Sequence, residues 1–180
     1  LFYAFDNFGQ DAILSKNLAG QLSATADIGG NIRSTGEIVP LSLNGECRFH
    51  LTNGAIVNFE PFEKIGKILF RKRNLSNVTF EKLENRLYIR GDKIIIPPMQ
   101  IASSALNVFL EGTYGLSRTG TDINMEIPLR NPRKDELESE VVKQAKSRKG
   151  IVLYLEAVSD EDGKVKIKWN TDGKRIEPVY

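Results

Sequence analysis

The chain has few of the residues that most often build catalytic and metal sites. Its 180 residues include one cysteine, Cys47, and one histidine, His50. A single cysteine excludes an internal disulfide and a cysteine-based metal cage. Cys47 and His50 together offer fewer ligands than a metal site needs. We therefore interpret both residues as ordinary members of a strand, either buried or at the edge of a sheet.

Motifs of the common catalytic classes are also missing from the sequence. Gly29-Gly30 lacks the lysine and the strand-to-helix setting of a phosphate-binding loop. No nucleophile elbow and no HExxH sequence occurs, and any Ser-His-Asp arrangement would have to use His50, around which there is no motif. The sequence predicts a protein that is not an enzyme and holds no cofactor or metal, with a degenerate enzyme domain as the least favoured alternative.

Long apolar runs and a strong net charge are absent as well. No run approaches the roughly 20 apolar residues of a membrane-spanning helix. The formal net charge of +2 gives no sign of the concentrated basic surface that nucleic-acid binding needs. The chain opens on Leu1 without a signal-peptide pattern. We interpret residues 1–180 as a single domain taken from a longer chain, with any membrane anchor outside it and no nucleic-acid partner.

What the sequence does contain is apolar and polar residues in alternation, the pattern of β-strands with one face toward water. The clearest case lies between residues 164 and 169, where three lysines alternate with Val165, Ile167 and Trp169. Shorter runs of the same kind are found at residues 78–80, 87–89, 106–111 and 123–127. Residues 94–96 and 151–155 are continuously apolar, which predicts strands covered on both faces.

Turn residues separate these runs at short intervals and predict hairpins. Asn53-Gly54, Arg90-Gly91-Asp92 and Asp162-Gly163 are the main examples. The acidic residues at 160–162 lack the further ligands of a calcium loop, so we interpret them as a hairpin tip. Pro97-Pro98 is expected to end the strand at residues 94–96, because proline cannot donate a hydrogen bond to a neighbouring strand.

Two segments break the strand pattern and predict helices. Residues 61–70 place a proline at the first helical position and apolar residues at helical spacing. Residues 134–149 carry acidic residues early and basic residues late, followed by Gly150, an order that complements the helix dipole and ends in a suitable cap. The sequence thus predicts a mostly β fold with antiparallel strands, two short peripheral helices, and a terminal hairpin at residues 151–170.

Four stretches in a fixed order resemble the C-terminal region of AsmA-like proteins. They are residues 51–62, which contain the sequence Asn53-Gly54, and residues 75–83, 94–108 and 110–114. The resemblance covers about residues 41–129 and rests on the order of the elements more than on any one motif. It does not extend to the charged helix at 134–149 or to the final hairpin.

The resemblance implies a non-catalytic function at membranes. AsmA-like proteins are typically anchored in the inner membrane by an N-terminal helix, with a β-rich body in the periplasm. They are implicated in phospholipid transport between inner and outer membranes and in outer-membrane assembly. The expected partners are phospholipid acyl chains and an inner- or outer-membrane protein. The alternative is a terminal cap or docking module that binds a membrane-protein partner by strand addition.

A strongly curved antiparallel sheet, a groove or half-barrel, would present its apolar side as a trough for acyl chains. The same apolar side chains would be ordinary core if helices or a second sheet covered them, and the sequence leaves both alternatives open. The candidate residues, facing either lipid or the core, are Leu106, Val108, Leu110, Ile123, Met125, Ile127, Val165, Ile167 and Trp169.

Overall fold

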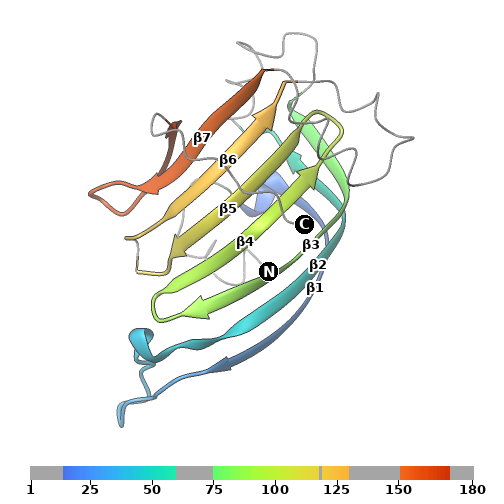
Figure 1. The fold of residues 1–180 in the computed structure, drawn as a ribbon. Helices are drawn as coiled ribbons and strands as arrows, with labels where there is room; N and C mark the ends of the chain where they lie inside the picture. Colours follow the sequence, from blue (N-terminus) through green and yellow to red (C-terminus); the bar gives the residue numbers. More distant parts are fainter. Residues whose placement is uncertain (1–13, 60–74, 118, 130–150, 171–180) are drawn as a thin grey trace.

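The computed structural model describes residues 14–59, 75–117, 119–129 and 151–170. These residues form one sheet of eight antiparallel strands, arranged side by side in chain order (Figure 1). The strands are β1 (Leu18–Gly29), β2 (Asn44–Val57), β3 (Asn77–Arg90), β4 (Lys93–Ala102), β5 (Asn107–Gly115), β6 (Asp122–Pro128), β7 (Val152–Ser159) and β8 (Val165–Trp169). The only helical elements in this part of the chain are the 3-10 turns η2 (Ser15–Asn17) and η3 (Pro40–Ser42). The sheet is not closed, and β1 and β8 form its two edges.

The prediction of a mostly antiparallel β fold is confirmed. Every predicted run of alternation lies in a strand, and residues 151–170 form the β7–β8 hairpin apart from their terminal residues. The helices predicted at 61–70 and 134–149 lie outside the described residues. Two of the predicted turns also occur, with Gly91 at φ 62° between β3 and β4 and Gly163 at φ 76° between β7 and β8. Glycine adopts these left-handed angles without strain.

The turn predicted at Asn53-Gly54 is wrong, because both residues lie inside β2. Asn53 has φ 50°, so the left-handed conformation that suits a turn is present but produces a local irregularity within the strand. Asparagine tolerates this conformation better than most residues. Gly54 stands opposite Phe80 of β3 and is covered by its aromatic ring. The glycine here makes room for a side chain.

The strand end predicted at Pro97-Pro98 is also wrong, because β4 continues through both prolines. β3 pairs with β4 only between residues 88–90 and 93–95, so the prolines have no ladder to β3 in which an N–H is required. The pairing of β4 with β5 shifts register between Ile96 and Met99, which accommodates the prolines on that side. Beyond them, Ser104 donates its N–H to the Thr79 carbonyl at 2.8 Å and reconnects β3 with the end of β4.

One of the two continuously apolar runs, at residues 94–96, is not covered on both faces, contrary to prediction. Ile95 remains 36% exposed. In the other run, Val152 to Leu155 of β7 are half-buried or buried. No second sheet or described helix lies over the strands in the part of the chain that the structure describes. A single layer of strands leaves alternate side chains of even an apolar run in contact with solvent.

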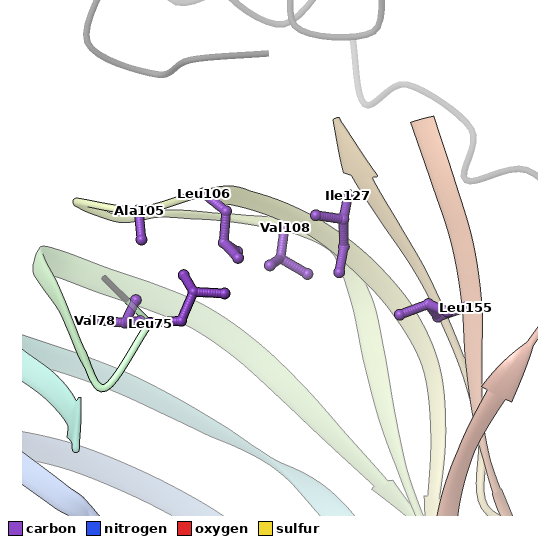
Figure 2. Close-up of a cluster of buried hydrophobic side chains, with 7 residues drawn as sticks. All are labelled: Leu75, Val78, Ala105, Leu106, Val108, Ile127 and Leu155. Carbon is purple, nitrogen blue, oxygen red and sulfur yellow. The ribbon is translucent and has the colours of Figure 1, made fainter. Parts of the chain in front are cut away.

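The buried core lies at one end of the sheet. Its side chains come from the start of β3, the β4–β5 connection, and β5, β6 and β7, and Figure 2 shows them pointing toward one another. The members of this core cluster are Leu75, Val78, Ala105, Leu106, Val108, Ile127 and Leu155. The remaining strands extend away from this cluster without a comparable buried set among the described residues.

A candidate apolar binding face

One face of the sheet is apolar across all eight strands. Residues that stand opposite one another in an antiparallel register project from the same face, so the register connects side chains from strand to strand. One row runs from β4 to β8 through Met99, Leu110, Met125, Leu155 and Trp169. We call the face that carries this row the apolar face and the opposite one the polar face.

Two further rows carry the apolar face to the other edge of the sheet. The first runs from β1 to β5 through Ile28, Gly45, Ile89, Ile94 and Tyr114. It lies on the same face as the previous row because Tyr114 and Leu110 of β5 are separated by an even number of residues. The second connects Leu22, Leu51 and Leu83 of β1, β2 and β3. The side chains of these two rows leave little polar surface on the β1–β5 part of the apolar face.

The nine candidate residues all contribute to this side of the molecule but differ in exposure. Leu106, Val108 and Ile127 are at most 8% exposed and belong to the core cluster. Ile167 and Trp169, on the edge strand β8, are 46% and 58% exposed. The half-buried candidates between these extremes are Leu110, Ile123, Met125 and Val165. The apolar face is therefore core near the β4–β5 connection and open to solvent at β8.

The candidate residues predicted from the sequence do not include the half of this face that β1 to β4 provide. Leu22 and Ile28 of β1 are 46% and 49% exposed there, and Ile89 and Ile94 continue the face inward. A signal was present, since residues 22–28 alternate apolar and polar throughout. Two of the apolar positions are alanines, and their small side chains weakened the contrast.

The polar face carries ion pairs between neighbouring strands and along them. Glu84 of β3 contacts His50 Nδ1 at 3.2 Å and Lys82 Nζ at 2.9 Å. Hydrogen bonds first from Lys82 and then from His50 lower the pKa of the Glu84 carboxyl group. Further pairs on this face are Arg48–Glu46, Arg86–Glu46 and Lys168–Glu156. Exposed pairs of this kind contribute little stability, but they keep this face hydrated.

Part of the polar face is nevertheless buried. Phe109 of β5 and Glu126 of β6 stand opposite one another in register and are 5% and 4% exposed. Tyr154 of β7 is the next residue in the same row and is half-buried. The polar face is therefore open around His50 and Glu84, and covered around Phe109 and Glu126 and at the start of β3, where Phe80 is 7% exposed.

Cys47 and His50 do not form a site together. Cys47 lies in the row of Ala26 and Leu87 on the apolar face, whereas His50 pairs with Glu84 on the polar face. The described residues contain no group of three or more histidine, cysteine or acidic side chains placed to hold a metal ion. Nor does any helix among them have the length and apolarity to cross a membrane.

No protein-family model, curated protein or solved structure matches this chain. The resemblance to AsmA-like proteins therefore rests only on the sequence stretches quoted above.

Proposed function

We propose that this chain is a non-catalytic lipid-binding domain of the AsmA-like type, in which phospholipid acyl chains lie along the apolar face. The observation that supports this most is the division of one sheet into an ion-paired polar face and an apolar face that stays partly exposed from Leu22 on β1 to Trp169 on β8. Transport of phospholipid between two membranes, a periplasmic location and an inner-membrane anchor outside this segment follow from the sequence resemblance and are part of the same proposal.

An acyl chain suits the chemistry of this face. It needs no hydrogen bonds, and the rows through Met125 and Ile94 supply almost none. Each methylene group that leaves water for an apolar surface contributes about 0.8 kcal/mol. Large exposed apolar patches on soluble domains commonly mark binding surfaces. A lipid would cover the half-exposed side chains that the single layer of strands leaves in water.

We further infer that the sheet curves, so that the apolar face lines a groove. The support is the membership of the core cluster, which joins Leu75 and Val78 at the start of β3 to Ile127 of β6 and Leu155 of β7. Strands lie about 4.8 Å apart, so β3 and β7 of a flat sheet would be about 19 Å from each other. A bend of the sheet would shorten this separation on the concave side and bring the members of the cluster closer together. Short helices at 61–70 and 134–149 remain part of this proposal on the sequence pattern alone.

A docking module is the second candidate. It is favoured by the outer edge of β1, which pairs with no other strand in the described part of the chain. A membrane-protein partner could add a strand there. This function does not need the apolar face to stay open, so lipid binding separates the two candidates.

The test compares the same substitution on opposite faces of the sheet. Ile167 projects from the apolar face and is 46% exposed, whereas Ile95 projects from the polar face and is 36% exposed. Aspartate at either position can remain hydrated, so both Ile167→Asp and Ile95→Asp should fold. We expect native mass spectrometry with lipid extraction to find lipid on the wild type and on Ile95→Asp, and to find it lost or several-fold reduced on Ile167→Asp.

Val108→Asp provides the opposite control. Val108 is 8% exposed within the core cluster, and an unpaired buried charge destabilises a fold by several kcal/mol. This variant should lower the melting temperature strongly. Lipid bound equally by Ile167→Asp and the wild type, or no lipid on any folded sample, would contradict the proposed function.

A further inference from the structure

The outer edge of β1 is a free surface for strand pairing. β1 spans Leu18–Gly29 and, among the described strands, pairs on one side only, with β2. Every residue from Gln21 to Gly29 is exposed. No hydrogen bond to another described element satisfies the outward backbone groups of this stretch. A long edge with unpaired N–H and C=O groups is a template for another strand.

The two edges of the sheet differ in how they are protected. β8 has five residues, and Lys166 and Lys168 project from it, which are features that oppose edge pairing. β1 has twelve residues and carries Asp27 as its single charged side chain, without proline or lysine. Strand addition is therefore disfavoured at the edge of β8 and favoured at the edge of β1.

We propose that β1 pairs antiparallel with β1 of a second copy of this chain, about a twofold axis at Thr25. In this register Leu22 stands opposite the partner's Ile28, and Ala24 stands opposite the partner's Ala26. Two large apolar side chains and two small ones are thus matched on the apolar face, and cross-strand pairs of this kind stabilise a sheet.

The polar face fits the same register. Ser23 stands opposite the partner's Asp27, so a hydroxyl donor faces a carboxylate acceptor, and Thr25 stands opposite the partner's Thr25. Moving the axis to Ala24 or Ala26, the neighbouring positions that keep both apolar faces on one side, would place Leu22 opposite an alanine or a glycine. Of these three registers, the one about Thr25 matches the apolar side chains of β1 best by size.

The pairing joins the apolar faces of the two copies. A twofold axis perpendicular to the sheet leaves corresponding faces on the same side, so the row that ends at Ile28 continues into the partner's Leu22. This inference rests on the edge of β1 and not on lipid binding. It holds for a dimer whose apolar face binds any ligand or none.

Disulfide trapping tests the register. In a Cys47→Ser background, Thr25→Cys places two thiols opposite each other, with Cβ atoms about 4.5–5.5 Å apart. A mild oxidant should convert this variant to a covalent dimer. Gln21→Cys is the matched control on the same face of the same strand. It stands opposite the partner's Gly29 and about 27 Å from the partner's Gln21, and it should stay monomeric on a non-reducing gel.

A charge variant tests the interface in solution. Thr25 neighbours Arg48 of β2 within its own copy, so Thr25→Glu gains an attractive neighbour in the monomer but opposes a second glutamate in the dimer. Sedimentation velocity should show the wild type and Thr25→Gln as dimers, and Thr25→Glu should shift to the monomer with an unchanged circular dichroism spectrum. Association through the apolar face would not respond to this change.

Several results would overturn the proposal. The wild type could sediment as a monomer at every concentration, or Gln21→Cys could form a disulfide as readily as Thr25→Cys. A dimer that Thr25→Glu leaves intact would place the contact elsewhere. A β1 edge that accepts a strand of a different protein, while the wild type stays monomeric, would support the docking module instead of the self-paired dimer.

Discussion

At the scale of single residues, Gly54 of β2 leaves room for the Phe80 side chain of the neighbouring strand β3. The ring of Phe80 lies over its backbone, so any Cβ at this position would collide with the ring. Asn53 next to it takes a left-handed angle inside β2. Asn53-Gly54, a dipeptide typical of turns, thus lies inside β2, where the Phe80 ring of β3 packs against it.

Gly54→Ala tests this interpretation. The added methyl group must displace the Phe80 ring, and overpacking of this kind costs about 1–3 kcal/mol. We expect urea denaturation to show a loss of stability in that range. Gly29→Ala is the matched control, because its nearest atom is the Asn44 carbonyl oxygen at 3.8 Å. Equal effects of the two substitutions would show that strand propensity, and not the ring of Phe80, is responsible.

The residues also show where sequence patterns were sufficient. Val165, Ile167 and Trp169 alternate with lysines, and the structure places them on one face of β8 as expected. The sequence could not divide the candidate residues into core and open face. Exposure depends on which strands meet at the start of β3, and nothing in the alternation of residues 106–111 shows that Val108 is buried while Ile167 is not.

At the scale of elements, the β7–β8 hairpin is fixed by its acidic tip. Asp160 accepts the Lys164 N–H at 2.8 Å and contacts Lys166 Nζ at 2.8 Å. The hydrogen bond from Lys166, followed by that from Lys164, lowers the pKa of the Asp160 carboxyl group. The same contact with Asp160 raises the pKa of the Lys166 ammonium group. Residues 160–162 close a hairpin, as their spacing predicted.

These shifts give the hairpin a defined pH dependence. A lowered carboxyl pKa stabilises the fold above the unfolded value, and this contribution is lost as the pH falls through the lowered pKa of Asp160. A raised ammonium pKa stabilises below the unfolded value and is lost as the pH rises through the raised pKa of Lys166. We expect Asp160→Asn to lower the melting temperature slightly at neutral pH and to match the wild type in strong acid. Glu161→Gln is the control, and a pH-independent effect of Asp160→Asn would contradict the mechanism.

The existence of β3 to β8 was predictable at this scale, but β1 was not among the predicted strands, and strand limits were not predictable. Proline and the Asn-Gly pair normally end strands, and here both lie inside them. Pro97 and Pro98 are tolerated because β3 has already separated from β4 at that point. That tolerance depends on the pairing of a different strand, which local sequence does not contain.

At the scale of the whole molecule, stability should be unequal across the sheet. The core cluster joins β3, β5, β6 and β7, while β1 is exposed along almost its whole length. Backbone amides with few buried neighbours open most easily. We expect native-state hydrogen exchange to be fastest in β1 and slowest in β5 and β6 in dilute solution.

The concentration dependence of exchange gives a further control. If β1 pairs with a second copy, its protection should rise with protein concentration, whereas that of β5 and β6 should not change. Protection of β1 equal to that of β6 in dilute solution would contradict the unequal stability that we expect.

The junction between β3 and β4 divides the sheet into a panel of three strands and a panel of five. The panels are joined by backbone pairing at Tyr88–Arg90 and again through Thr79 and Ser104. Between these points, only the Asn85 side chain, which donates to the Pro97 carbonyl at 3.2 Å, connects the described parts of β3 and β4. β2 and β3 are paired along nearly their full length, so each panel is stiffer than the seam. A force applied across the strands should therefore separate the two panels at the β3–β4 junction before it separates the strands within either panel.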